Sequence, residues 1–277
     1  MKQYIYLCFL FIFSTSCVDV IDVDVPTKTP TLVIEASLDW EKGTVGNVQH
    51  IKLSLSTPYF ETTIPSVENA VVTVTKNDDN TTFTFTHQND GIYTTNNFIP
   101  QISQSYTLTV LYNNETYTAT ETLLAVPEIT NIYQSTEDGF DEELTEINIT
   151  FNDPAEKKDQ YLMKFTKQND DIPPIFDSFD DEFRNGNEIT VFYERDIEDS
   201  EQQYFEIDDV IDINFHAISK QYYDYMSLLL EQSEEGNPFS TVPVPFRGNC
   251  INLTDADKYA YGYFRVTEVE KRSYTIQ

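Results

Sequence analysis

The chain has 277 residues, and its 47 acidic and 17 basic side chains give a formal net charge of −30 at pH 7. This charge argues against nucleic acid as a partner, because nucleic-acid binding requires a positively charged surface. It also argues against a body that lies flat on an anionic membrane. At this length the chain can form one large or two ordinary domains with cores of their own.

The first 16 residues are typical of a bacterial lipoprotein signal peptide. Lys2 precedes an apolar run from Tyr4 to Phe13, which is too short to cross a bilayer. The small residues Ser-Thr-Ser then lead to Cys17, in an arrangement that resembles a relaxed lipobox. We therefore predict that Cys17 is lipidated, which would anchor the chain permanently once two or more acyl chains are attached. The alternative is an ordinary signal peptide with an incidental cysteine.

Residues 17–29 form an acidic tether in this interpretation. Asp19, Asp22 and Asp24 alternate with Val and Ile. The segment resembles the acidic export signal that follows the lipidated cysteine in surface lipoproteins of Bacteroidota. It predicts an outer-membrane protein that faces the cell exterior, with the periplasmic face as the alternative. The same pattern also fits a solvated tether or a strand with one wet face.

Residues 30–127 predict an Ig-like or prealbumin-like antiparallel β-sandwich. About seven short strands alternate apolar and polar residues, and Asn-, Asp- and Gly-containing turns separate them. The clearest strands are 32–38, 51–56, 70–76, 81–87, 105–112 and 115–123. Tyr106 begins an alternating strand, in a position where a tyrosine often fixes a corner of such a sandwich. Pro127 cannot donate to a strand ladder and therefore suits a linker.

Residues 128–277 predict a second β-rich domain with one amphipathic helix. The expected strands are 129–133, 144–151, 160–166, 189–193 and 212–216, followed by two closing strands at 260–266 and 273–276. Residues 170–188 are expected to be a loop. The helix is expected over residues 219–235, with Ser219 as its cap and Gly236 and Pro238 ending it.

Taken together, these features resemble a family of Bacteroidota lipoproteins known as domain of unknown function 4249. The resemblance covers nearly the whole chain after the signal peptide. It rests on Cys17 with its acidic segment, LVIEASL at 32–38, the strands from 67 to 129, and the C-terminal sequences YYDY, NPFS, GN and GYF that end at Phe264. Because members often occur beside TonB-dependent outer-membrane transporters, the resemblance implies an accessory role. It implies no chemistry.

Residues that could carry chemistry are few. The three histidines have no second His or Cys at zinc-ligand spacing, and no nucleophile elbow, Walker loop or dinucleotide fingerprint is present. Cys250 is expected to be a small buried hydrophobe, because no candidate base is near it, Cys8 is lost with the signal peptide and Cys17 is lipidated. We therefore expect no catalytic residues and no cofactor.

Two acidic loops offer oxygen ligands for calcium without following the EF-hand order. One contains Asp177, Asp180 and Asp181. The other contains Asp138, Asp141 and Glu142. In so acidic a chain, either loop is also explained as a solvated surface.

Four aromatic residues are candidates for contact with a ligand or partner. Trp40 follows a predicted strand and could either present a platform for a sugar ring or close one end of the sandwich core. Phe176, Phe179 and Phe183 lie in the acidic loop, where they would meet a partner or hold the loop against the second domain.

The leading hypothesis is a non-enzymatic, surface-exposed outer-membrane lipoprotein that helps a TonB-dependent transporter to take up a nutrient. The first alternative is a glycan- or peptide-binding lipoprotein that acts alone. The second is a hydrolase that uses scattered carboxylates, which would need two of them at a fixed separation in a cleft.

Overall fold

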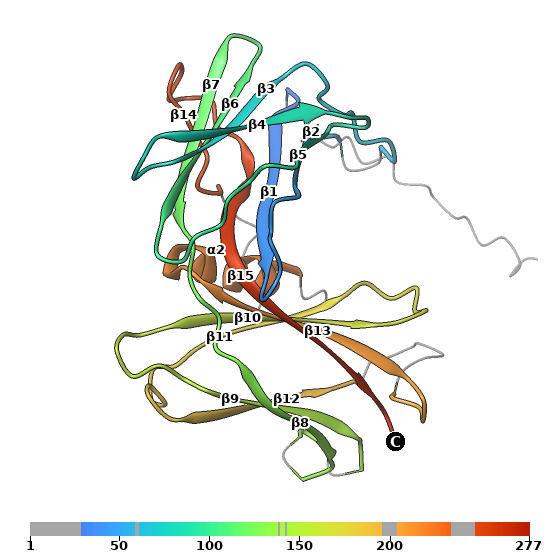
Figure 1. Cartoon of the computed structure of the whole chain (residues 1–277). Helices are drawn as coiled ribbons and strands as arrows, with labels where there is room; N and C mark the ends of the chain where they lie inside the picture. Colours follow the sequence, from blue (N-terminus) through green and yellow to red (C-terminus); the bar gives the residue numbers. More distant parts are fainter. Residues whose placement is uncertain (1–28, 59–60, 138, 142, 196–203, 234–246) are drawn as a thin grey trace, which may run out of the picture.

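The computed structural model describes residues 29–58, 61–137, 139–141, 143–195, 204–233 and 247–277. These residues form a mainly β structure of two stacked sandwiches with one helix between them (Figure 1). The mainly β prediction is confirmed. The lipidation site Cys17, the acidic residues Asp19, Asp22 and Asp24, and nearly all of the predicted tether lie outside the described residues.

The N-terminal sandwich is built from the first seven strands. They are β1 (Leu32–Glu41), β2 (Gln49–Leu55), β3 (Val71–Lys76), β4 (Thr81–His87), β5 (Ile92–Thr95), β6 (Ser105–Tyr112) and β7 (Glu115–Thr122). Neighbours pair antiparallel in the order β1-β2-β5-β4-β3-β6-β7. Their alternating apolar side chains enclose one core, so the predicted antiparallel sandwich is confirmed. Tyr106 is buried, and its hydroxyl donates to the carbonyl of Ile99, as a corner tyrosine does.

The C-terminal sandwich has two sheets. Its strands are β8 (Ile129–Ser135), β9 (Glu146–Asn152), β10 (Gln160–Lys167), β11 (Ile175–Asp180), β12 (Glu188–Glu194) and β13 (Val210–Ile218). Strands β12, β9 and β8 form one sheet, whereas β11, β10 and β13 belong to the sheet that continues into the N-terminal sandwich. Phe151, Tyr161 and Phe215 pack between the two sheets with ring centroids 4.7 to 5.3 Å apart.

One long strand, β15 (Tyr261–Thr275), joins the two sandwiches. Its first part pairs parallel with β1 and its last part pairs antiparallel with β13, as the red strand in Figure 1 shows. Eight consecutive residues, Tyr263 to Glu270, are buried because both faces of the strand are covered. Gly262 has a φ of +83°, and a Cβ there would lie 2.1 Å from the carbonyl oxygen of Ile34, so only glycine fits this approach of β15 to β1.

A buried ion-pair network lies where β15 crosses between the sandwiches. The Arg265 guanidinium donates to both carboxylate oxygens of Asp39 at 2.7 and 2.9 Å, and it lies 5.0 Å from the Tyr222 ring centroid. His216 Nε2 lies 3.5 Å from Asp39. Burial alone would raise the pKa of Asp39, but Arg265 and His216 together hold it below its ordinary value. Burial lowers the pKa of His216.

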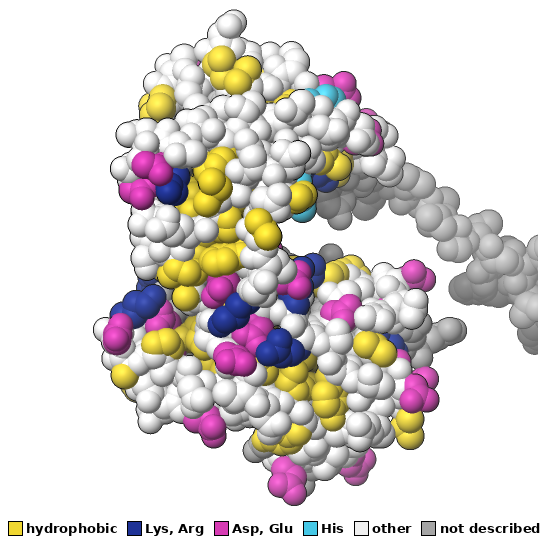
Figure 2. All heavy atoms as spheres, in the orientation of Figure 1, with side chains coloured by type: hydrophobic (Ala, Val, Ile, Leu, Met, Phe, Trp, Pro, Cys, Tyr) yellow, Lys and Arg dark blue, Asp and Glu magenta, His cyan; other side chains and the backbone are white. Residues whose placement is uncertain are grey.

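The next part of β15 also buries acidic residues. The carboxylates of Glu268 and Glu270 accept hydrogen bonds from the backbone N–H groups of Val126 and Ile129, and Lys42 lies 3.8 Å from Glu270. Basic and acidic side chains are interleaved on this side of the molecule at the level where the sandwiches meet (Figure 2). The hydrogen bonds of Glu268 and Glu270 therefore fix the start of the C-terminal sandwich to β15.

Two expectations about the C-terminal half are wrong. Residues 175–180, expected within a loop, form β11, which pairs with β10 at the edge of the sheet. The two closing strands are one continuous strand, because Glu268 and Glu270 find buried partners that their polarity did not predict. The short β14 (Ile251–Asn252), which pairs with β7, was also missed.

The predicted helix is present as α2 (Lys220–Ser233). Ser219 caps it, since its hydroxyl accepts the N–H of Tyr222. Tyr222 and Met226 face a small apolar cluster that includes Leu162 of β10 and Tyr263 of β15. The helix therefore covers the face of β10 that is turned away from the C-terminal core. The predicted end of the helix, with Gly236 and Pro238, lies outside the described residues.

The boundary predicted at residue 127 stays a prediction. Leu123 belongs to the N-terminal core and Val126 to the C-terminal core, which agrees with a division near that position. However, the N-terminal core also contains Cys250, Phe264 and Val266, which return from the far end of the chain.

Candidate functional site

A partly apolar cleft lies at the outer end of the N-terminal sandwich, and we call it the tyrosine cleft. Its volume is about 450 Å³. The described lining consists of Thr29, Pro30, Thr31, Leu32, Leu55, Tyr112, Asn113, Glu115, Tyr117, Asp257, Lys258 and Tyr259. An apolar floor with a few polar groups is the usual composition of a small-ligand site.

Four segments of the chain build the tyrosine cleft. The start of β1 supplies Leu32, the end of β2 supplies Leu55, and the β6–β7 hairpin supplies two tyrosines. This hairpin turns through Asn113 and Asn114, whose φ values of 49° and 61° are those of a two-residue type I′ turn. The segment between β14 and β15 supplies the remaining wall, so the cleft forms only when the C-terminal end of the chain returns to the first sandwich.

Glu115 and Lys258 in the cleft are paired with each other. The Glu115 carboxylate accepts hydrogen bonds from Lys258 and from the Tyr117 hydroxyl, the latter at 2.6 Å. The hydrogen bond from Lys258 lowers the pKa of Glu115, whereas burial and then Glu115 raise the pKa of Tyr117. At neutral pH, Glu115 is therefore ionised and Tyr117 protonated. This pair is not poised to exchange a proton with a substrate, so its chemistry suits binding.

Aromatic rings continue from the cleft along the surface. The ring of Tyr259 lies 5.2 Å from that of Tyr261 in an edge-to-face arrangement, and the Arg247 guanidinium lies 4.1 Å from the centroid of Tyr259. Rings with amide and carboxylate neighbours can bind a ligand that has both apolar faces and hydroxyl or amide groups. Sugars and peptides have this character.

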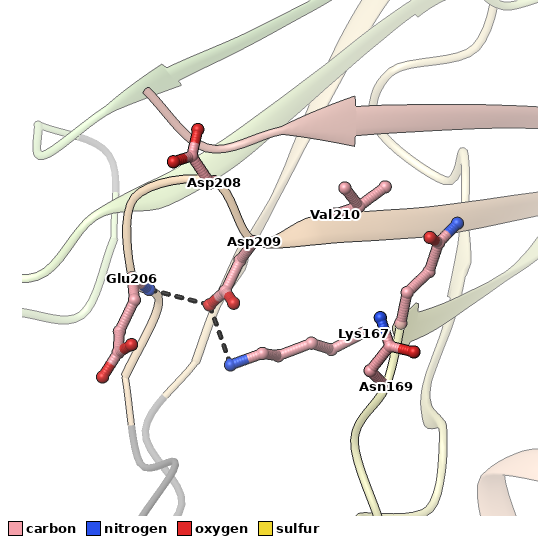
Figure 3. Close-up of a pocket in the computed structure, with 7 residues that line it drawn as sticks. Lys167, Asn169, Glu206, Asp208, Asp209 and Val210 are labelled. Carbon is pink, nitrogen blue, oxygen red and sulfur yellow. Dashed lines mark hydrogen bonds and ion pairs between the residues drawn. The ribbon is translucent and has the colours of Figure 1, made fainter.

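A second hollow, of about 320 Å³, lies at the start of β13 (Figure 3). Its lining is polar, and Lys167, the one basic residue in its described lining, lies 2.8 Å from Asp209. Asp209 also accepts the backbone N–H of Glu206 at 2.8 Å. Because Asp209 neutralises Lys167, this hollow has little to offer an anionic ligand.

The sequence-predicted aromatic residues do not form one site. Trp40 packs against the N-terminal core and donates to the carbonyl of Thr44, so it matches the core-closing alternative. Phe179 packs on the C-terminal core, and Phe176 occupies the opposite face of β11. Phe183 is 96 % exposed in the turn that follows β11. Only Phe176 and Phe183 remain available to a partner.

The predicted acidic residues are also separated. Asp177 and Asp180 lie on β11, whereas Asp181 is fully buried next to two acids that sequence reasoning did not select, Asp153 and Asp159. Each of these three carboxylates offers one oxygen within 4.8 Å of the others. Their spacing along the chain matches no motif, so only the fold could reveal the group. Of the other acidic loop, Asp138 and Glu142 lie outside the described residues.

Cys250 is buried in the N-terminal core. Burial raises its pKa to about 12, so the thiol is un-ionised at neutral pH. The expectation of a small buried hydrophobe is confirmed.

A family model described as "Domain of unknown function (DUF4249)" matches residues 18–273. This chain belongs to that family. No curated protein matches this DUF4249 chain. None of the helical residues that the structure describes forms a segment both long enough and apolar enough to cross a membrane.

Solved structures similar to this DUF4249 chain are distant from it. They include the FN1–FN3 domains of chicken CNTN1, with 13 % identity, a TM-score of 0.27, and coverage of 69 % of this chain and 62 % of that one. A segment of two fibronectin type III domains from chicken tenascin has 10 % identity and a TM-score of 0.23, and the match covers 69 % of this chain and 91 % of that one. A DUF4785 family protein from Legionella pneumophila has 9 % identity and a TM-score of 0.26, with coverage of 68 % and 51 %.

Proposed function

We propose that this DUF4249 chain is a non-enzymatic lipoprotein of the outer membrane, which faces the cell exterior. It binds a nutrient of the glycan or peptide class and passes it to a TonB-dependent transporter. The observation that carries the proposal is the tyrosine cleft, because its wall begins at Thr29, the last residue of the predicted tether.

The length of the tether keeps the cleft near the membrane. Thr29 follows Cys17 by 12 residues. A fully extended chain spans at most about 3.6 Å per residue, so Thr29 lies within about 43 Å of a lipid attached to Cys17. A ligand bound there stays within reach of the external loops of a neighbouring barrel. The acidic body, repelled by anionic lipid, extends away from the membrane surface.

The pairing of charges in the cleft supports binding without chemistry. Glu115 is fixed by Lys258 and Tyr117, and Tyr259 offers its ring beside Asn113 and Asp257. An aromatic face next to amide and carboxylate groups can stack on a sugar ring or a peptide plane while its neighbours accept hydrogen bonds.

The partner is tested by purification from outer membranes in mild detergent. The full chain is expected to bring a TonB-dependent barrel with it, and Cys17→Ala is expected to lose both the acyl mass at the N-terminus and the barrel. Recovery of no barrel by the acylated chain contradicts the transporter role. An N-terminus without fatty acid, found by mass spectrometry, contradicts the anchor.

The cleft is tested separately with glycan and peptide arrays. We expect the full chain to retain a ligand and Tyr259→Ala to lose it, because the stacking face is removed. Phe183→Ala is the matched control, since it removes an exposed ring far from the cleft. Retention by the full chain without any copurified barrel favours the alternative of a binding lipoprotein that acts alone.

A further inference from the structure

Three buried aspartates meet at one end of the C-terminal sandwich, and we call them the aspartate trio. Asp153 follows β9, Asp159 precedes β10, and Asp181 follows β11. Strand β9 belongs to one sheet of the sandwich, whereas β10 and β11 belong to the other. A group that binds all three carboxylates would therefore join the two sheets at this end.

The trio holds more negative charge than its surroundings neutralise. Asp153 and Asp159 are each 6 % exposed, and Asp181 is 0 % exposed. Among the described residues, the basic side chain that pairs with the trio is Lys157, whose Nζ lies 2.7 Å from Asp159 Oδ1 while most of its side chain faces solvent. Three buried carboxylates with one surface ammonium leave a deficit of positive charge, and unpaired buried charge is costly.

Two oxygens of the trio have no hydrogen-bond donor. Each oxygen of Asp153 accepts one hydrogen bond, Oδ1 from the Tyr161 hydroxyl at 2.5 Å and Oδ2 from the Gly186 N–H at 2.8 Å, which leaves a lone pair on each for an ion. Asp181 Oδ2 accepts the N–H of Asp159 at 2.9 Å. Asp159 Oδ2 and Asp181 Oδ1 are buried and have no partner in the described structure. Buried polar atoms of this kind are rare in folded proteins and call for a missing ion or water.

The alternative to a cation is a retained proton. Burial raises the pKa of Asp159, Lys157 opposes this shift, and Asp153 and Asp181 add to it. A single proton would remove one charge and satisfy one oxygen. It would leave two carboxylates buried side by side and one oxygen still without a donor.

We propose that the aspartate trio binds a Ca²⁺ ion that joins the two sheets of the C-terminal sandwich. The donors are hard carboxylate oxygens from loops, without histidine or cysteine, which suits calcium and not zinc. Calcium completes its six to eight ligands with water and accepts irregular geometry, whereas Mg²⁺ requires a near-ideal octahedron. This site stands independently of the tyrosine cleft, which lies at the outer end of the other sandwich.

Binding of the ion would also order the edge of the large sheet. Asp181 directly follows β11, the edge strand, and precedes the turn that carries Phe183. The expected affinity is that of extracellular calcium modules, with a Kd of about 0.1 to 1 mM.

The test uses the full chain in detergent after removal of metal with EDTA. Calcium chloride is expected to raise the Tm of the wild type saturably, and Tb³⁺ is expected to give luminescence sensitised by Tyr161 that Ca²⁺ competes away. Asp181→Asn keeps the shape and removes one charge, so its calcium affinity should fall by more than about tenfold. The matched control is Asp177→Asn. It removes an exposed carboxylate from the middle of β11, outside the trio, and its calcium affinity should equal that of the wild type.

Three results would overturn the proposal. They are the absence of a saturable Tm shift or Tb³⁺ signal in the wild type, an equal calcium response in Asp181→Asn and Asp177→Asn, and an equal response of the wild type to magnesium. If Asp181→Asn fails to fold, Asp159→Asn replaces it, with the same expected loss of calcium affinity. The Tb³⁺ titration of the wild type still tests whether the site binds an ion.

Discussion

The junction network around Asp39 and Arg265 holds a half-buried acid, whereas the aspartate trio holds three buried acids, and the two groups differ in what surrounds them. Asp39 at the junction has Arg265 and His216 as partners, and its pKa lies below the ordinary value. Asp159 in the trio has two other aspartates beside it, and its pKa is raised. The chain itself supplies cationic and imidazole partners for Asp39, whereas the trio leaves its negative charge open to an external ion.

This difference separates structural acids from acids that can bind. A buried carboxylate with a guanidinium partner contributes to the fold, and its loss leaves a buried charge without compensation. A group of buried like charges costs stability until something positive arrives. Abundance of acidic residues therefore says little, and the partners of each carboxylate decide its role.

The most severe expected loss at the junction comes from Gly262→Ala. A Cβ there would lie 2.1 Å from the Ile34 carbonyl oxygen and φ is +83°, so β15 must move away from β1. We expect the free energy of unfolding to fall by about 4 kcal/mol in urea denaturation. Gly43→Ala is the control, because φ is +82° there but nothing lies within 4 Å, and it should cost only about 1 kcal/mol. Equal losses would mean that close approach of the strands is unimportant.

The second largest effect is expected from Arg265→Ala. The change removes the partner of Asp39 and the contact with Tyr222, and breaking such a buried pair costs about 3 kcal/mol. Lys271→Ala breaks an exposed pair with Glu41 and should cost below about 1 kcal/mol. Adding Asp39→Ala to Arg265→Ala should recover part of the loss. A double variant as unstable as the sum of both single variants would contradict the pairing.

Removal of a charge from the trio should change the free energy of unfolding in the opposite direction from Arg265→Ala. In EDTA, Asp181→Asn removes one of three like charges, so unfolding should cost about 1 kcal/mol more than in the wild type. Chemical denaturation at neutral pH measures the difference. A loss of stability as large as that of Arg265→Ala would show that Asp181 supports the fold through its charge, and the contrast between the two regions would fail.

The smallest expected effect is on the pH dependence of stability in EDTA. Asp39 has a lowered pKa, so its contribution is present above about pH 4 and is lost as the pH falls. Asp159 has a raised pKa, so its contribution is present below about pH 4 and is lost as the pH rises. The quantity to compare is the free energy of unfolding at pH 7 minus that at pH 4. Asp159→Asn should make this difference more positive than in the wild type, and Asp39→Asn should make it more negative. Urea titrations at both pH values measure this difference for each variant. A change in the same direction for both variants would contradict the contrast between the junction and the trio.

Much of the fold could be predicted from local patterns. Alternating Val and Thr in residues 71–76 predict β3 because one face of a sandwich strand is buried. Ser219 and the stripe through Tyr222 and Met226 predict α2 because capping and a helical period act within a few residues. The prediction failed at residues 175–180, where pairing with β10 makes a strand of a segment that does not alternate apolar and polar residues.

The candidate sites could be predicted much less well. Asp181 was selected as a calcium ligand, but its companions were expected to be Asp177 and Asp180, which are its neighbours in sequence. The fold instead places Asp153 and Asp159 beside it, from the ends of other strands. Likewise, no pattern around Tyr112 or Tyr259 indicates that they line one cleft, since they meet only when the chain end pairs with β1.

The sequence by itself determined the β class of this protein, the position of its helix, its acidic character and its membership of the DUF4249 family, because these properties depend on composition, period and local capping. Only the tertiary structure decided that β15 joins two sandwiches, that the tyrosine cleft exists and that three aspartates share one buried site. These features rest on contacts between residues far apart in the chain, and burial and charge pairing act across such contacts without leaving a local pattern.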